Sequence, residues 1–199
     1  IKEFYLSKGF FYIKVGKPKV ELSENKKHLY VYFPVKEGPK YYTGDIKIIR
    51  SPDDEKIVRE KDIKKLITLK SGEAFNKIKL ELILFQIGDL YREKGYIRTQ
   101  VVPDYVIEEE SKLIHTKIYI THEPNPAVVE DIRVMGNKTT KEWFIKREIL
   151  IKPGDIYNVK KVRRSMEKVY NLGFFSDVKF DYRQGSSPDR IILILKVKE

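Results

Sequence analysis

The feature that most constrains this chain is an internal repeat. Residues 69–76, Leu-Lys-Ser-Gly-Glu-Ala-Phe-Asn, match residues 151–158, Ile-Lys-Pro-Gly-Asp-Ile-Tyr-Asn. Further along, residues 90–97 match residues 169–175, and residues 4–11 match both of these segments. Motifs that recur in the same order at a period near 80 residues indicate copies of one supersecondary unit. The sequence therefore predicts two complete repeats, preceded by a copy that keeps only its second half.

The last repeat gives the clearest local signals. Thr139 or Thr140 is placed to cap a first helix, Pro153 ends that helix, and Asn158 is placed to cap a second one. Gly173 suits the left-handed position that ends the second helix. The predicted inward faces are Trp143, Phe144 and Ile149 on the first helix, and Val159, Val162, Met166, Val169 and Tyr170 on the second. With its flanks, this repeat is predicted to run strand, helix, helix, strand, strand.

Strand patterns complete the three copies. Residues 42–49, 97–106 and 113–121 are predicted strands of the middle repeat, and residues 128–135, 176–182 and 191–197 are those of the last. In the first copy the predicted strands are residues 10–22, interrupted by Gly16 and Pro18, and residues 29–35, expected as an inner strand. Pro103 lies inside the strand 97–106, which indicates an edge because proline donates no hydrogen bond to a neighbouring strand.

The repeats resemble POTRA domains, the polypeptide-transport-associated modules of outer-membrane barrel-assembly and secretion proteins. The residues that carry the resemblance in the last copy are Gly136-Asn137, Arg147-Glu148, Pro153-Gly154-Asp155 with Tyr157, and Leu172-Gly173-Phe174-Phe175 with Val178. The middle copy departs from the pattern, because residues 50–54 stand where Gly-Asn is expected. The resemblance covers essentially the whole chain and points to a barrel-assembly protein of the BamA-like family.

The resemblance implies an α+β fold made of tandem POTRA repeats. Each repeat is β-α-α-β-β, with a three-stranded mixed sheet covered on one face by two helices. The last strand is expected at the centre, parallel to the first strand and antiparallel to the middle one. The expected domains are the C-terminal half of a truncated POTRA unit at 1–39, a complete unit at 40–124, and a complete unit at 125–199. The last unit is expected to precede a membrane β-barrel in the full-length chain, and residue 1 is expected to lie within a longer protein.

The residue inventory argues against catalysis and against bound metals or cofactors. The chain has no cysteine, and His28, His115 and His122 have no partner at a metal-binding spacing. The acidic run at residues 53–55 lacks the alternating ligands and central glycine of a calcium loop, so a solvated loop or helix start is expected there. No apolar run is long enough to cross a membrane as a helix. We therefore predict that the chain is not an enzyme and needs no cofactor.

The net charge of +11 leaves three interpretations open. A solvated surface is favoured, because Lys160, Lys161, Arg164 and Lys168 lie opposite the apolar stripe of their predicted helix. A nucleic-acid surface is the second, although no binding signature of known spacing supports it. The third is attraction of the last repeat to anionic lipid headgroups.

The predicted sheets suggest how such a chain would act. In each repeat the middle strand lies at an edge, where unpaired backbone groups can accept an extended segment by β-augmentation. The candidate binding residues are Ile97, Thr99, Val101, Tyr105, Ser176, Val178, Phe180 and Tyr182. The resemblance implies a periplasmic location, unfolded outer-membrane protein precursors as clients, and accessory assembly lipoproteins as docking partners. The alternatives are the POTRA region of a two-partner secretion transporter and a pure scaffold for accessory lipoproteins.

Overall fold

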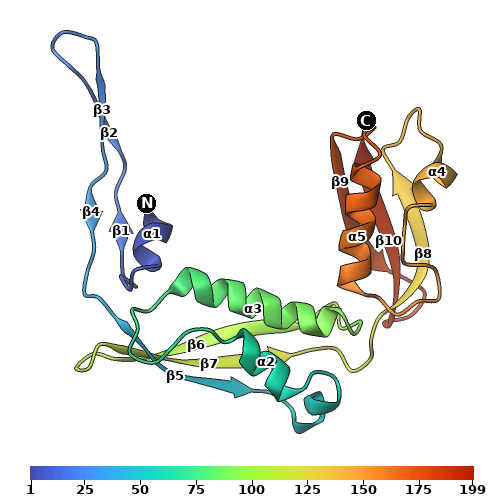
Figure 1. Ribbon diagram of the computed structural model, residues 1–199, viewed down its shortest axis with the longest axis horizontal. Helices are drawn as coiled ribbons and strands as arrows, with labels where there is room; N and C mark the ends of the chain where they lie inside the picture. Colours follow the sequence, from blue (N-terminus) through green and yellow to red (C-terminus); the bar gives the residue numbers. More distant parts are fainter. The chain divides into compact units, whose positions relative to one another are not determined.

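The computed structural model describes residues 1–199 as an α+β chain that divides into two compact units (Figure 1). Unit 1 comprises Ile1–Arg50, Lys61–Gln86 and Val101–Tyr119. Unit 2 comprises Ser51–Glu60, Ile87–Gln100 and Ile120–Glu199.

The main sheet of unit 1 belongs to the middle repeat. Its strands are β5 (Tyr42–Ile49), β6 (Gln100–Glu108) and β7 (Leu113–Thr121), in the order β5-β7-β6. The last strand, β7, is central and runs parallel to β5, with Ile48 opposite Ile118. A four-residue loop joins β6 to β7, and so short a connection requires antiparallel neighbours. The predicted mixed sheet with a central last strand is confirmed.

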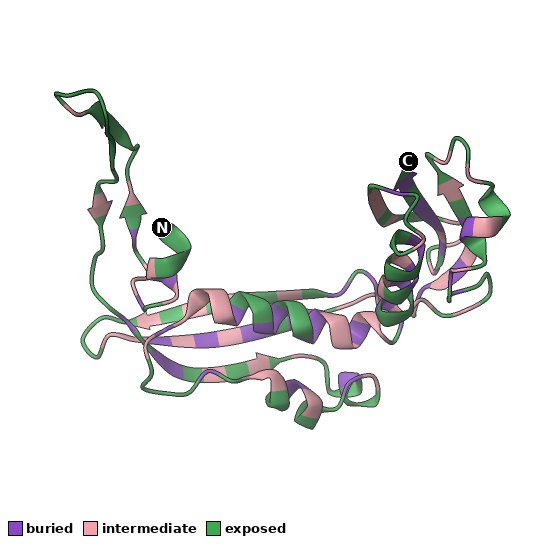
Figure 2. Ribbon diagram, turned by 45° about the horizontal axis from the view of Figure 1, so that its top comes forward, coloured by how far each residue is buried: buried purple, intermediate pink, exposed green.

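Helices cover one face of this sheet. The helical elements of the repeat are η1 (Pro52–Lys56), α2 (Glu60–Leu66) and α3 (Lys77–Arg92). Within unit 1 the inward residues Ile63 and Leu80 are fully buried and Ile83 nearly so, while Ile114 and Ile118 of β7 are fully buried beneath them. Figure 2 shows that buried and exposed residues recur in turn along α3. Burying each of these side chains contributes about 1.5–3 kcal/mol, so this apolar face holds the helices on the sheet.

The first repeat forms no three-stranded sheet. After α1 (Lys2–Leu6), residues 14–36 form a two-stranded hairpin. One arm contains β1 (Lys14–Val15) and β2 (Lys19–Leu22). The other contains β3 (Leu29–Tyr32), which pairs with β2, and β4 (Val35–Lys36), which pairs with β1. The prediction of an inner strand at residues 29–35 is wrong. All four side chains of β3 are exposed, and Pro34 separates β3 from β4. Residues 1–40 supply no third strand and no second helix that would cover this hairpin.

The sheet of the last repeat lies in unit 2. Its elements are β8 (Val128–Met135), α4 (Glu142–Lys146), α5 (Val159–Tyr170), β9 (Asp177–Gln184) and β10 (Arg190–Lys198). The strand order is β8-β10-β9, with β10 parallel to β8 and antiparallel to β9. Alternate residues of β10 enter one apolar core with α4, α5 and β8, namely Ile191, Leu193, Leu195 and Val197. This order leaves β9 at an edge, as the sequence predicts.

Helix α5 has the cap and the apolar spacing that the sequence indicates. The side chain of Asn158 accepts a hydrogen bond from the Lys161 N–H at 3.0 Å, which satisfies one free donor of the first turn. Val162 and Val169 are buried against the sheet. Gly173 has φ +78°, a left-handed value that residues with a Cβ rarely adopt. The same helix corrects one prediction, because Tyr170 is 55% exposed rather than part of the core.

The start of α4 differs from the predicted one. Neither Thr139 nor Thr140 caps it, because the N-cap position falls on Lys141, which makes no side-chain capping hydrogen bond. Thr139 and Thr140 donate their N–H groups to the carboxylate of Glu199, at 2.9 and 2.8 Å. Trp143 is 63% exposed, whereas Ile145 is fully buried. A helix of five residues turns only one or two side chains inward, and Ile145 takes that position.

One carboxylate of the acidic run is buried. Asp54, expected in a solvated loop or helix start, lies in η1 at 3% exposure. Its Oδ1 lies 3.1 Å from Nε2 of His122, and its Oδ2 accepts from the Tyr91 hydroxyl at 3.4 Å. Buried carboxylates require such partners. His122 therefore has the structural role that the sequence favours for it, and Asp54 corrects the expectation of solvation.

Candidate functional site

The edge of β9 presents backbone donors that its own sheet does not use. Gly185 donates to the carbonyl of Arg190 at 2.8 Å, and these two residues stand opposite each other in the β9–β10 register. Hydrogen-bonded pairs alternate along an antiparallel ladder, so the N–H groups of Val178, Phe180 and Tyr182 point away from β10. An added strand would pair with these groups.

Aspartate side chains of β9 lie over part of this edge. Oδ1 of Asp181 accepts the N–H of Tyr182 at 2.8 Å, and its Oδ2 accepts from Nζ of Lys196 at 2.7 Å. The ammonium of Lys196 and the N–H of Tyr182 hold the pKa of Asp181 below its usual range. The pKa of Asp177 is lowered mainly by Lys179, with a contribution from the N–H of Val178. Charged side chains of this kind are a usual means of protecting an exposed sheet edge.

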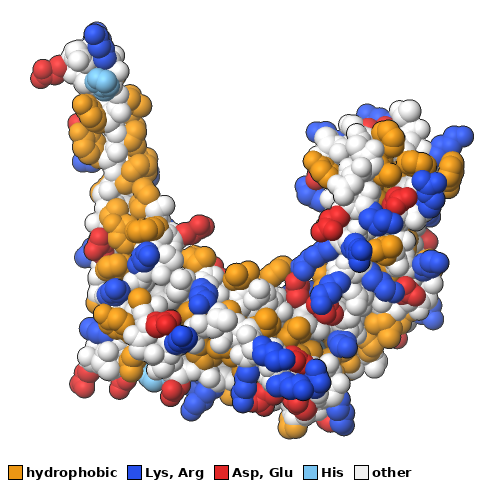
Figure 3. Space-filling view, viewed as in Figure 1, with side chains coloured by type: hydrophobic (Ala, Val, Ile, Leu, Met, Phe, Trp, Pro, Cys, Tyr) orange, Lys and Arg blue, Asp and Glu red, His pale blue; other side chains and the backbone are white.

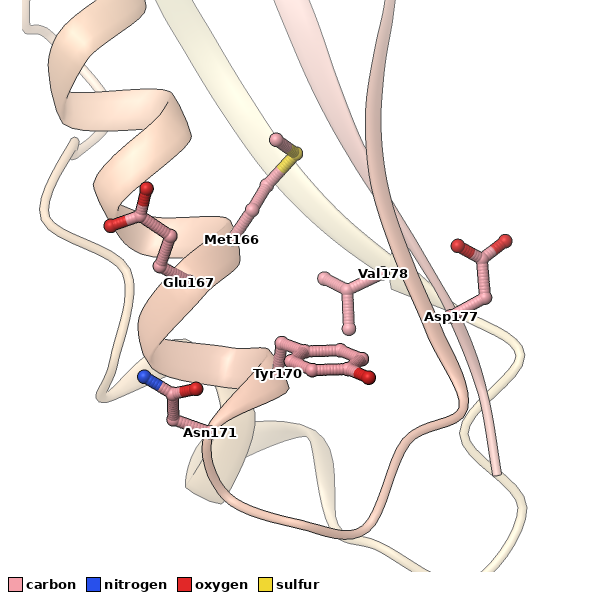
Figure 4. A pocket seen from close by; sticks show the side chains of 6 residues that line it. All are labelled: Met166, Glu167, Tyr170, Asn171, Asp177 and Val178. Carbon is pink, nitrogen blue, oxygen red and sulfur yellow. The ribbon is translucent and has the colours of Figure 1, made fainter.

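A groove runs beside this edge, between α5 and β9. It measures about 430 Å³ and is lined by Met166, Glu167, Tyr170, Asn171, Asp177 and Val178. Figure 4 shows Met166, Tyr170 and Val178 directed toward one another, with Asp177 turned away. An apolar floor next to a sheet edge that pairs with no further strand can hold alternate side chains of an extended segment.

The edge of β6 in unit 1 is different. Pro103 stands in the middle of the strand and has no N–H to donate. Tyr105 is half-buried between two aromatic rings, with centroid distances of 5.2 Å to Phe11 and 6.0 Å to Phe75. Burial and the carboxylate of Glu81 raise its pKa. The side chains of β6 are therefore partly engaged within unit 1.

The structure divides the predicted binding residues into two groups. Val101 and Tyr105 lie on β6, and Val178, Phe180 and Tyr182 lie on β9. The other three lie just before the strands, at Ile97, Thr99 and Ser176. Ile97 and Thr99 are also buried, so the expectation of strand-edge positions is wrong for them. The N–H of Ser176 is already bonded to the carbonyl of Lys198, at 2.7 Å.

Sequence reasoning missed three residues at the β9 edge. Met166 and Tyr170 were assigned to the core face of α5, although they line the groove. The sequence places both residues in the apolar stripe of α5. That they lie on the side of the stripe next to β9 follows only from the way the helix packs on the sheet. Asp181 was not singled out, because an aspartate that accepts the next residue's N–H has no distinct sequence signal.

The acidic and histidine side chains form no cluster of the kind that holds a metal ion. No group of three or more histidine, aspartate or glutamate side chains has metal-binding geometry in residues 1–199. The helices of the chain are also too short or too polar to span a bilayer. The features that remain are two sheet edges and a groove in a tandem repeat of strands and helices.

These features define a class of α+β repeat protein whose sheets keep open edges. The model of the POTRA family, described as a surface antigen variable number repeat, matches residues 41–122 and 127–199. The chain belongs to the POTRA family.

Relatives of the chain are outer-membrane assembly factors. The outer membrane protein assembly factor BamA of Buchnera aphidicola is 28% identical over 200 residues, covering 100% of this chain and 32% of that protein. A putative outer membrane protein assembly factor of Treponema pallidum is 31% identical over 167 residues, or 84% of this chain and 19% of the relative. The chain thus spans about a third of the first relative and a fifth of the second.

A solved structure has the same fold. The crystal structure of POTRA domains 3–5 of Haemophilus influenzae BamA matches with a TM-score of 0.87 at 21% identity. The match covers 100% of this chain and 77% of that one. The POTRA fold of this chain therefore occurs in a solved structure.

Proposed function

We propose that this chain is the periplasmic POTRA region of an outer-membrane protein assembly factor, and that it receives unfolded β-barrel precursors by β-augmentation. The observation that carries the proposal is the free edge of β9. The N–H groups of Val178, Phe180 and Tyr182 point away from β10, beside an apolar groove. Main-chain pairing along such an edge depends little on client sequence, which suits a protein that receives many different precursors.

The proposed organisation follows the repeats. Residues 1–39 form the second half of a POTRA unit, residues 40–124 form a complete unit, and residues 125–199 form the unit that precedes a membrane β-barrel. The relatives extend well beyond the matched region, which leaves room for the missing half-unit and for a barrel.

The test is an NMR amide-shift titration of the 199-residue chain with an extended, amphipathic peptide copied from a barrel strand. We expect shifts at the outward amides of Val178, Phe180 and Tyr182, and at groove residues Met166 and Tyr170. A peptide of the same composition in scrambled order, with its apolar alternation lost, is the control. Silence along β9 with the fold intact and the peptide in excess would overturn the receiving role and favour the pure scaffold.

A further inference from the structure

The end of the last repeat that contains α4 and the last residue of β10 carries exposed aromatic side chains. Trp143 is 63% exposed and Phe174 is 56% exposed. Phe144 lies between them, with ring centroids 5.9 Å from Trp143 and 6.1 Å from Phe174. Three adjoining aromatic side chains, two of them more than half exposed, need a reason in a protein that otherwise buries a regular core.

Contacts between chain segments hold this cluster at one end of the sheet. The carboxylate of Glu199 accepts the N–H groups of Thr139 and Thr140, which fixes the loop before α4 against the end of β10. Those two hydrogen bonds lower the pKa of Glu199 to about 2. Ser176, two residues after Phe174, donates to the carbonyl of Lys198 at 2.7 Å. These hydrogen bonds therefore hold the segments that carry the aromatic residues against the end of β10.

Exposed cationic side chains accompany the aromatic ones on the same chain segments. The exposed cations of this end are Lys138, Lys141, Lys146, Arg147 and Lys198. The guanidinium of Arg147 lies over the ring of Phe144 at 4.8 Å, and Lys146 pairs with Glu142 at 2.7 Å. Residues 138–147 contain four cations and one carboxylate. Figure 3 shows hydrophobic and cationic side chains intermixed on this part of the molecule.

We propose that this aromatic–basic surface, centred on Trp143, Phe144 and Phe174, rests on an anionic lipid bilayer. Tryptophan and phenylalanine insert between headgroups at a membrane interface, and lysine and arginine are attracted to anionic headgroups. The exposed rings of Trp143 and Phe174 and the excess of cations over residues 138–147 together fit this occupant. The proposal rests on the proposed function only in placing an outer membrane near this repeat, and it is independent of strand addition at β9.

Trp143 provides the readout, because it is the only tryptophan of the chain. Its fluorescence emission is followed as the 199-residue protein is titrated with vesicles of phosphatidylcholine, with or without phosphatidylglycerol. We expect a blue shift with the anionic vesicles, quenching by brominated acyl chains, and weakening of both effects as salt is raised.

Two sets of variants separate the components of this surface. The double variant Lys138→Gln/Lys141→Gln should weaken binding about fivefold for each lysine lost, while Lys17→Gln/Lys19→Gln should not. Phe174→Ser should weaken binding about tenfold or more, while Phe85→Ser, which alters a similarly exposed phenylalanine of α3, should not. Circular dichroism confirms that each variant folds.

Three results would overturn the inference. The first is an equal blue shift with neutral and anionic vesicles, and the second is unchanged binding by Phe174→Ser. The third is a blue shift that appears without vesicles as the protein concentration rises, which would assign the surface to a second copy of the chain. A failure here leaves the peptide titration of β9 unaffected, so the two proposals fail separately.

Discussion

The two complete repeats have the same topology, yet their edge strands β6 and β9 differ. β6 contains Pro103 and places Tyr105 between Phe11 and Phe75. β9 has no proline, presents outward N–H groups, and borders a groove lined by Met166 and Tyr170. An edge position alone therefore does not make a strand a receiving site, because backbone donors and free apolar neighbours are also needed.

The largest expected effect of a substitution is at Tyr105 of β6. Tyr105→Ala removes a half-buried ring that contacts two others, and should lower the free energy of unfolding by about 2 kcal/mol. Peptide binding at β9 should not change. Chemical denaturation and the peptide titration measure the two effects. If stability stays within about 0.5 kcal/mol of the parent while peptide binding falls, Tyr105 is a binding residue and β6 is a receiving edge.

Tyr182→Pro tests the donors of β9. The substitution removes one outward N–H and places a ring where the added strand would lie, so peptide affinity should fall about tenfold or more. Tyr182→Thr keeps the N–H and is the matched control. The fold should persist, because an edge strand accepts proline where its N–H faces solvent. Equal peptide affinity in the proline and threonine variants would contradict main-chain pairing at this edge.

The reciprocal change, Pro103→Thr, tests whether the missing backbone donor alone makes the edge of β6 differ from that of β9. It gives β6 a backbone donor without touching Tyr105, and we expect peptide shifts to remain centred on β9. New shifts of equal size along β6 would show that the proline alone accounts for the difference between the edges.

The ionisation of the Tyr41 side chain allows a separate test of unit 1. Burial and its hydrogen bond to Glu109 raise the pKa of Tyr41 to about 12. A raised pKa means that this tyrosine stabilises the fold fully below its unfolded pKa of about 10 and loses that contribution as pH rises through about 12. Tyr41→Phe should cost about 1 kcal/mol near neutral pH. Ultraviolet absorbance should show the loss of a tyrosine that ionises near pH 12 in this variant, and an unchanged titration at that pH would contradict the assignment.

Replacing Asp181 should have the smallest effect on peptide affinity, and it should raise that affinity instead of lowering it. Its carboxylate competes for the N–H of Tyr182, so Asp181→Ala should tighten peptide binding about threefold. Asp104→Ala, the matching change on β6, should have no effect. Because the pKa of Asp181 is lowered, its carboxylate stays charged at mildly acidic pH, and peptide affinity should be constant above about pH 5. Weaker binding by Asp181→Ala would mean that the carboxylate recognises the client instead of protecting the edge.

The repeat motifs predicted most of the fold because local signals and tertiary packing agree in the complete repeats. Asn158 caps α5, Gly173 ends it in the left-handed region, and β10 takes the centre of its sheet. Prediction failed where tertiary contacts decide the outcome. Thr139 and Thr140 have the chemistry of caps, but their loop is bound to the distant Glu199 and α4 begins after Lys141, past both threonines.

The candidate site was less predictable than the fold. Alternation along the sequence locates both edge strands, but it predicts the start of β6 three residues early, at Ile97, and that of β9 one residue early, at Ser176. The sequence also could not distinguish an engaged edge from a free one. That distinction depends on Phe11 reaching Tyr105 from the first repeat, and on the way α5 lies beside β9.

The most direct test of the central claim, that β9 and not β6 receives the client strand, uses the absence of cysteine from the chain. Single cysteines are placed in turn along Val178–Tyr182 of β9 and along the matching stretch of β6. Each variant is then mixed with a barrel-strand peptide that carries one cysteine, and disulfide formation is measured. The account predicts efficient cross-linking along β9 that alternates with a period of two residues, and weak cross-linking without alternation along β6. Equal yields on both edges, or a stronger alternation on β6, would contradict it.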